Sequence, residues 1–244
     1  MHHDRTEREG VHRRKFNGWA VLACTLAGGL ALPAARANGL QSLASSEITQ
    51  GLRLALGQGV RSAINSLGTE NGFWGNPAVR IGLPDGLAKA TRALKMLGMG
   101  RQVDDLTLQM NRAAEAAVPL SADLLGKAVE SLTVEDARAI VQGGETSVTR
   151  FFAERTRAPL SQAFEPVVDR VLQGHGVVER YNAVTGKLAA SGLYKPEGAS
   201  LQAHVTGRTL DGLFALIGEE ERRLRQNPAQ AGSALLGKVF GGLR

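Results

Sequence analysis

Apolar residues recur at helical spacing along almost the whole chain. Over residues 46–67 they stand at every fourth position, at Ile48, Leu52, Leu56, Val60 and Ile64. Such a stripe gives an α-helix one face that packs against a core. No convincing run alternates apolar and polar residues, which is the pattern of a half-buried strand. The sequence therefore predicts an all-α protein.

Turn and cap residues divide this pattern into about nine helices, which we expect to form a single helical domain over residues 38–244. In one helix Thr133 and Asp136 predict a capping box, and the last helix is short, over residues 228–240. Between the first two helices lies a long loop, residues 68–85. It holds four glycines and two prolines, but also five large apolar side chains. Because this apolar content argues against disorder, we expect an ordered segment laid across the helices.

A stripe of small residues runs along the first helix of this domain, at Gly51, Ala55, Gly59 and Ala63. Each glycine costs a helix about 1 kcal/mol, so the close approach of another backbone is the expected compensation. The favoured interpretation is a tightly packed core helix. The alternative is a face through which two copies of the chain form a homo-oligomer.

The first 37 residues have the layout of a cleavable export signal. Arg13-Arg14-Lys15 precedes an uncharged stretch over residues 16–35, and Ala35-Arg36-Ala37 has the small-x-small pattern that signal peptidase cleaves. This layout predicts cleavage after Ala37 and a periplasmic location. The paired arginines followed by x-Phe16 resemble a twin-arginine signal, and the general secretion route remains the alternative.

Two other interpretations of the leader are weaker. Val21-Leu22-Ala23-Cys24 is a loose lipobox, which would make Cys24 a lipid-bearing N-terminus. The apolar stretch continues past this cysteine, however. The length of the apolar stretch would also allow an uncleaved membrane anchor, since about 20 apolar residues span a bilayer. Pro33, Asn17 and the glycines of the leader argue against an anchor.

Composition excludes several classes of function. Cleavage would leave 23 basic and 20 acidic residues, no cysteine, and only His175 and His204 as histidines. We therefore expect no thiol nucleophile, no disulfide scaffold and no metal or iron–sulfur site. We also expect no cofactor. A diffuse charge of +3 with few aromatics offers neither the basic stripe nor the stacking platform of a nucleic-acid-binding protein. The sequence also lacks a nucleophile elbow, a phosphate loop and a dinucleotide-binding loop, so we lean against an enzyme.

Polar side chains share one face of the helix that begins near Val103. Asp104, Asn111 and Glu115 follow helical spacing, and Arg112 stands beside Glu115. One interpretation makes Glu115 a buried acid or base whose neighbours tune it. The favoured interpretation is a structural hydrogen-bonded network, because buried polar groups must be paired in any protein.

Two further charged groups lie on the last long helix. His204, Arg208 and Asp211 form a stripe, which we interpret as an ion pair rather than part of a catalytic triad. Three consecutive glutamates, ending at Glu221, stand four residues before arginines that include Arg225. This second pattern predicts ion pairs on a solvated helix end.

Long segments of the chain resemble an uncharacterised bacterial family, domain of unknown function number four thousand one hundred and ninety-seven. The segments are Phe73-Trp74-Gly75-Asn76-Pro77-Ala78-Val79-Arg80-Ile81-Gly82-Leu83-Pro84, Met110-Asn111-Arg112-Ala113-Ala114-Glu115-Ala116-Ala117-Val118-Pro119 and Leu210-Asp211-Gly212-Leu213-Phe214. The resemblance covers about residues 43–241. It implies an exported, all-helical, single-domain protein, and it implies no activity and no catalytic residues.

These observations leave three hypotheses. The leading one is a non-enzymatic periplasmic protein that binds another protein or a small ligand where the loop lies over the polar helix face. The candidate binding residues are Trp74, Asn76, Arg80, Asn111, Arg112, Glu115 and Asp211. The second hypothesis is an envelope-associated enzyme using Glu115 as acid or base. The third is a membrane-surface protein, tethered through Cys24 or lying on anionic lipid by its excess of Lys and Arg.

Overall fold

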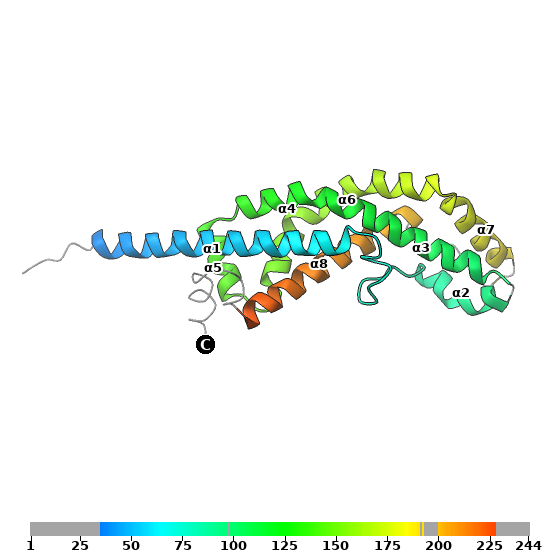
Figure 1. Ribbon diagram of the computed structural model, residues 1–244, viewed down its shortest axis with the longest axis horizontal. Helices are drawn as coiled ribbons and strands as arrows, with labels where there is room; N and C mark the ends of the chain where they lie inside the picture. The colour runs from blue at the N-terminus through cyan, green and yellow to red at the C-terminus, as the bar shows by residue number, and fades with distance from the viewer. Residues whose placement is uncertain (1–34, 97, 191, 193–199, 228–244) are drawn as a thin grey trace, which may run out of the picture.

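The all-α prediction is confirmed. The computed structural model describes residues 35–96, 98–190, 192 and 200–227, and side chains from residue 45 onward (Figure 1). This part of the chain forms helices and no strand. In chain order the elements are α1 (Ala35–Leu67), α2 (Asp85–Met96), α3 (Gly100–Ala117), the 3-10 turn η1 (Val118–Leu120), α4 (Ser121–Glu130), α5 (Val134–Gln142), α6 (Ser147–Gly174), α7 (Val177–Ala190) and α8 (Leu201–Gln226).

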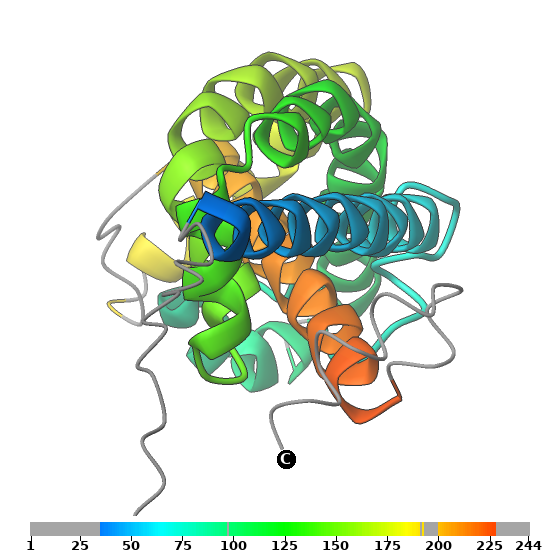
Figure 2. The same cartoon turned by 90° about the vertical axis from the view of Figure 1, so that its left-hand side faces the viewer.

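Helices α6 and α8 pack along one another and form the centre of the molecule. Helix α8 also packs on α1 and α3, and α3 in turn carries α2 and α7. The molecule is elongated, with the start of α1 at one end and α2 and α7 at the other (Figure 1). Figure 2 shows α8 crossing α1. The core between these helices includes the fully buried side chains Leu52, Leu67, Phe73, Leu106, Met110, Phe152 and Phe164.

The expected helices between residues 46 and 226 are present, with two differences. Helix α1 begins at Ala35 rather than at Ser46. Helix α6 continues unbroken across Pro159 and Pro166, at which we expected a kink or a division. Helix α6 has buried side chains on both sides of the prolines and packs against α3 and α8, so tertiary packing outweighs the lost backbone hydrogen bonds.

The capping box is confirmed. The hydroxyl of Thr133 accepts a hydrogen bond from the Asp136 amide at 3.0 Å, and the Asp136 carboxylate accepts one from the Thr133 amide at 3.1 Å. Burial raises the pKa of Asp136, but these hydrogen bonds, together with that from the Arg155 guanidinium, outweigh it. The pKa of this carboxyl is therefore lower than its ordinary value.

The predictions about the chain termini lie outside the described residues. These are the arginine pair at Arg13-Arg14, the lipobox at Cys24 and the short helix over 228–240. Cleavage after Ala37 falls within α1 and stays a prediction. Within the described part of the chain, no helix combines the length and apolar character needed to cross a bilayer.

The small-residue stripe of α1 is buried inside the chain. Gly51, Ala55, Gly59 and Ala63 are all buried, and a Cβ on Gly59 would lie 3.4 Å from the Glu220 Cβ on α8. The stripe thus serves close packing between helices of one chain. Association of two copies through these residues would require α8 to move away, and it stays a prediction.

Candidate functional site

The predicted loop is an ordered segment, residues 68–84, which we call the strap. It runs as a series of turns and then as extended chain from residue 80 to the start of α2. Phe73 and Ile81 are buried beneath it. A Cβ at Gly72 would lie 2.5 Å from the carbonyl oxygens of Ser66 and Leu67, so only glycine fits where the chain leaves α1. Close contacts and burial therefore fix the path of the strap.

Glu115 on α3 anchors the first half of the strap. Its Oε1 accepts hydrogen bonds from the amides of Phe73 at 3.0 Å and Trp74 at 3.1 Å. Its Oε2 accepts a hydrogen bond from Arg112 at 2.6 Å, and the side chain is only 5% exposed. The carboxylate thus satisfies two backbone donors in a segment that has no helix or sheet to satisfy them.

Asn111, one turn earlier on α3, anchors the second half. Its side-chain oxygen accepts from the Ile81 amide at 2.8 Å, and its amide nitrogen donates to the Ile81 carbonyl at 2.9 Å. The same nitrogen donates to the Thr107 carbonyl at 2.7 Å, and Asn111 is fully buried. The asparagine side chain therefore pairs with the extended strap as a neighbouring strand would.

Arg112 links the strap to Glu115. Its second terminal nitrogen donates to the side chains of Asn71 at 2.9 Å and Glu70 at 3.2 Å. Asn71 has a φ of 68°, a left-handed conformation that asparagine tolerates better than most residues. The guanidinium thus joins the turn at the start of the strap to the buried carboxylate.

Helix α8 holds the other side of the strap. The Phe73 ring packs over Gly212, where a Cβ would come within 2.7 Å of the ring edge. The Nε2 of His204 lies 3.0 Å from the Gly82 carbonyl oxygen. The strap therefore lies between α3 and α8. Its amides donate to side chains of α3, and its Phe73 ring packs against α8.

The outer side of the strap carries the remaining candidate residues. The Arg80 guanidinium lies over the Trp74 ring at 4.7 Å from its centroid, and its Nε donates to the Trp74 carbonyl at 2.6 Å. Asn76 accepts a hydrogen bond from the Ala78 amide within the same turn. These contacts close the turn over residues 74–80, and they leave the Trp74 ring partly exposed.

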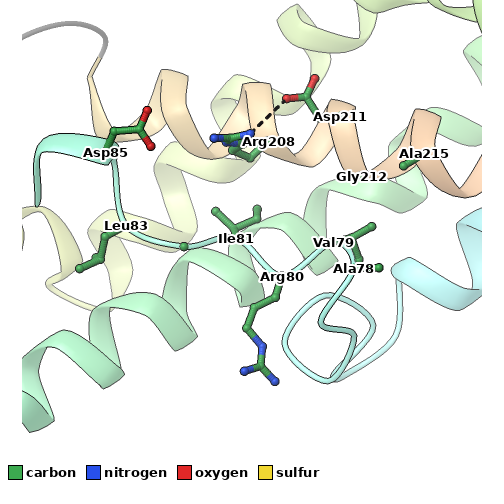
Figure 3. A pocket seen from close by; sticks show the side chains of 11 residues that line it. Ala78, Val79, Arg80, Ile81, Leu83, Asp85, Arg208, Asp211, Gly212 and Ala215 are labelled. Carbon is green, nitrogen blue, oxygen red and sulfur yellow. Dashed lines mark ion pairs between the residues drawn. The ribbon is translucent and has the colours of Figure 1, made fainter. Parts of the chain in front are cut away.

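An open pocket of about 460 Å³ lies between the strap and α8 (Figure 3). Its charged groups are Asp85 at the start of α2, and Arg208 and Asp211 on α8. Asp211 pairs with Arg157 of α6 at 2.6 Å and with Arg208 at 4.0 Å. The Arg80 side chain points away from α8 in Figure 3, so it borders the pocket through its backbone.

The candidate residues therefore separate into three groups. Asn111, Arg112 and Glu115 lie beneath the strap and hold it, whereas Trp74, Asn76 and Arg80 close the turn on its outer side. Asp211 lies on α8 and faces the pocket. Both oxygens of Glu115 are occupied, and Glu115 does not line this pocket. Within the described residues, no three His, Cys, Asp or Glu side chains gather as they would around a metal ion.

A second buried carboxylate, on α8, was not expected. Glu221 is 1% exposed, and it accepts hydrogen bonds from the amides of Val148 at 3.0 Å and Thr149 at 3.1 Å, at the start of α6. Arg225 pairs with it at 3.0 Å, as predicted from their spacing. The prediction of a solvated helix end was wrong for Glu221, because the start of α6 docks on this turn. Its helical register is the signal that could have found it, since Glu221 follows the buried residues Phe214 and Ile217 at helical spacing and Glu219 does not.

The family comparison covers both the strap and its supports. Residues 42–241 match the model of the family described as Protein of unknown function (DUF4197). This range includes α2 to α8 and most of α1. No curated protein and no solved structure matches the chain. The resemblance seen in the strap and α3 segments is thus confirmed, and the chain belongs to the DUF4197 family.

Proposed function

We propose that this protein is an exported helical binding protein, and that its partner enters the pocket between the strap and α8. One observation carries the proposal. An irregular segment of 17 residues is held in a single path by buried polar side chains of α3, and its free edge forms the wall of an open pocket. Ordering a loop costs about 1–2 kcal/mol per residue in backbone entropy, so a loop held in this way is pre-organised.

The pocket suits a polar, extended ligand such as a segment of another protein. It presents charges of both signs, from Arg208, Asp211 and Asp85. The Gly82 amide has no hydrogen-bond partner within the described residues, and a Cβ at Gly82 would meet no atom within 4 Å. This amide supplies a donor to an incoming carbonyl or carboxylate without displacing any internal contact.

The contacts of Glu115 favour a supporting role over acid or base catalysis. A general base must reach the proton that it abstracts, and each oxygen of this carboxylate is already hydrogen bonded inside the protein. No observation in the structure favours the enzyme hypothesis over the binding hypothesis.

Photo-crosslinking in living cells tests the pocket. We expect a photoreactive residue at Ala78 and one at Ala215, both exposed on the pocket walls, to capture the same partner. The same residue at Ala122, exposed on α4, serves as the matched control and should not capture it. Neutralising the α8 charges with Arg208→Ala and Asp211→Ala should abolish the capture.

Two results would contradict the proposal that the partner binds in the pocket. One is capture at Ala122 as strong as at the pocket walls. The other is a capture that needs Trp74 and Arg80 but neither Arg208 nor Asp211, which would move the contact to the outer face of the strap.

Export is tested by the mass of the protein recovered from the periplasm. We expect a chain that begins at Asn38. A lipid-bearing chain that begins at Cys24 would support the tethered alternative, and an uncleaved chain found only in the cytosol would contradict export.

A further inference from the structure

Helix α2 presents an outward face that is strongly basic. Lys89, Arg92 and Lys95 are exposed along it, and Arg101 is exposed just beyond its end, on the first turn of α3. Residues 86–103 contain these four basic residues and no acidic one. We call this surface, together with Met96, the basic face.

The four cations of the basic face have no ion-pair partners within the described part of the chain. Elsewhere in that part, seven arginines do pair with acids: Arg112, Arg155, Arg157, Arg180, Arg208, Arg223 and Arg225. The nearest acids along the chain are Asp85 at the start of α2 and Asp104 and Asp105 on α3. None of the three forms an ion pair with the basic face among the described residues, and Asp105 pairs with Arg180 of α7 instead. The positive charge of α2 is therefore available to an external partner.

An exposed apolar side chain lies among these cations. Met96 at the end of α2 is 77% exposed, more than Leu54 or Leu120, the other large apolar side chains that are exposed among the described residues. The inner face of α2 is already used, because Leu87, Ala90 and Leu94 are buried against the rest of the protein. Only the basic face with its methionine remains for contact with a partner.

The position of α2 leaves this helix accessible to a flat partner. Helices α2 and α7 form one end of the elongated molecule, away from α4, α5 and the start of α1 (Figure 1). The strap and its pocket are next to this end, since α2 begins at Asp85, which lines the pocket.

We propose that the basic face docks the protein on a membrane surface that contains anionic lipids. Lys and Arg attract anionic headgroups, and an exposed flexible apolar side chain among them enters the interface. Nucleic acid fits less well, because the face has no aromatic side chain on which a base could stack. The docking is peripheral and sensitive to salt, and it does not depend on whether the pocket binds a partner.

A probe at the face itself separates this docking from any contribution of the leader. In a Cys24→Ser background, Met96→Cys is labelled with a polarity-sensitive fluorophore, and Ala122→Cys on α4 carries the same label as the control. We expect vesicles of phosphatidylglycerol and phosphatidylethanolamine to shift the emission at position 96 and not at position 122. Vesicles of phosphatidylcholine alone should shift neither.

Charge neutralisation then tests the cations. Each Lys or Arg near an anionic surface contributes about 1 kcal/mol, so Lys89→Gln with Arg92→Gln and Lys95→Gln should weaken the vesicle affinity on the order of a hundredfold. The matched control removes the same charge elsewhere, with Lys127→Gln, Arg138→Gln and Arg150→Gln. This control should retain the emission shift at position 96. High salt should abolish the shift both in this control and in the protein with an unchanged basic face.

Three outcomes would overturn the proposal. The first is an equal shift at positions 96 and 122, and the second is an equal loss of affinity in the two triple variants. The third is a shift at position 96 with duplex DNA that matches the shift with anionic vesicles, which would assign the basic face to polyanions in general.

Discussion

Two buried glutamates in this protein have nearly the same local chemistry and support very different segments. Glu115 pairs with Arg112 and accepts the amides of two consecutive strap residues. Glu221 pairs with Arg225 and accepts the amides of two consecutive residues at the start of α6. The first holds an irregular loop to a helix, whereas the second holds one long helix to another.

The difference lies in what surrounds each pair. Arg112 is 26% exposed and reaches Glu70 and Asn71 at the surface. Arg225 is 17% exposed, and its guanidinium also donates to the Ile140 carbonyl and the Ser147 hydroxyl. We infer that the Glu221 pair stabilises the global fold and that the Glu115 pair stabilises the local path of the strap.

Loss of the Glu221 carboxylate should have the largest effect. Glu221→Ala leaves Arg225 without its buried partner and two amides without an acceptor, and we expect a loss of about 3–5 kcal/mol in the free energy of unfolding. Urea denaturation measures this loss. The exposed glutamate two residues earlier supplies the control, since Glu219→Ala should change stability by less than about 0.5 kcal/mol. Equal effects of the two variants would contradict the buried role of Glu221.

Loss of the Glu115 carboxylate should cost less and act locally. Because Arg112 keeps its contacts with water and Asn71, we expect Glu115→Ala to lower the free energy of unfolding by about 2 kcal/mol. Trypsin should then cleave after Arg80 faster than in the unchanged protein, at urea concentrations too low to unfold the helices. Asp104→Ala, an exposed change on the same helix, is the control. A rate of cleavage that stays unchanged in Glu115→Ala would rule out the local role.

A methyl group added at Gly212, between α8 and the strap, should lower the free energy of unfolding by a smaller amount. Gly212→Ala gains about 1 kcal/mol in helix propensity but forces its Cβ to within 2.7 Å of the buried Phe73 ring. Overpacking costs about 1–3 kcal/mol, so we expect a net loss of about 1 kcal/mol in thermal or urea unfolding. Gly207→Ala on the same helix meets no atom and should stabilise the protein by up to about 1 kcal/mol. Stabilisation by both changes would show that the ring does not press on α8.

Disruption of the capping box of α5 should have a similarly small effect, with a defined pH dependence. The pKa of Asp136 is lower in the folded protein than in the unfolded chain. Its carboxylate therefore stabilises the fold fully at pH values above the ordinary carboxyl pKa of about 4, and this stabilisation is lost as the pH falls through the lower pKa of the folded protein. We expect Asp136→Asn to lose about 1 kcal/mol at neutral pH and nothing once the carboxyl is protonated. Urea unfolding across the acid range measures this difference. A loss that is the same at every pH would contradict it.

The fold and half of the candidate site could be predicted because their signals are local. The 3.6-residue period located the helices, and the density of polar groups on one face of α3 indicated the network around Asn111 and Glu115. The partners of Glu221 and the pocket could not be predicted in this way. The burial of Glu221 depends on the start of α6, more than 70 residues away in the sequence. Asp211 likewise meets Arg157 only through the packing of α6 on α8.

Amide hydrogen exchange of the strap tests the central claim most directly, namely that this loop is a fixed part of the fold. In the full-length protein we predict that the amides of Phe73, Trp74 and Ile81 exchange about as slowly as those in the middle of α3, because each donates to an anchoring side chain. Exchange of these three amides as fast as in the exposed turn over residues 144–146 would contradict the account.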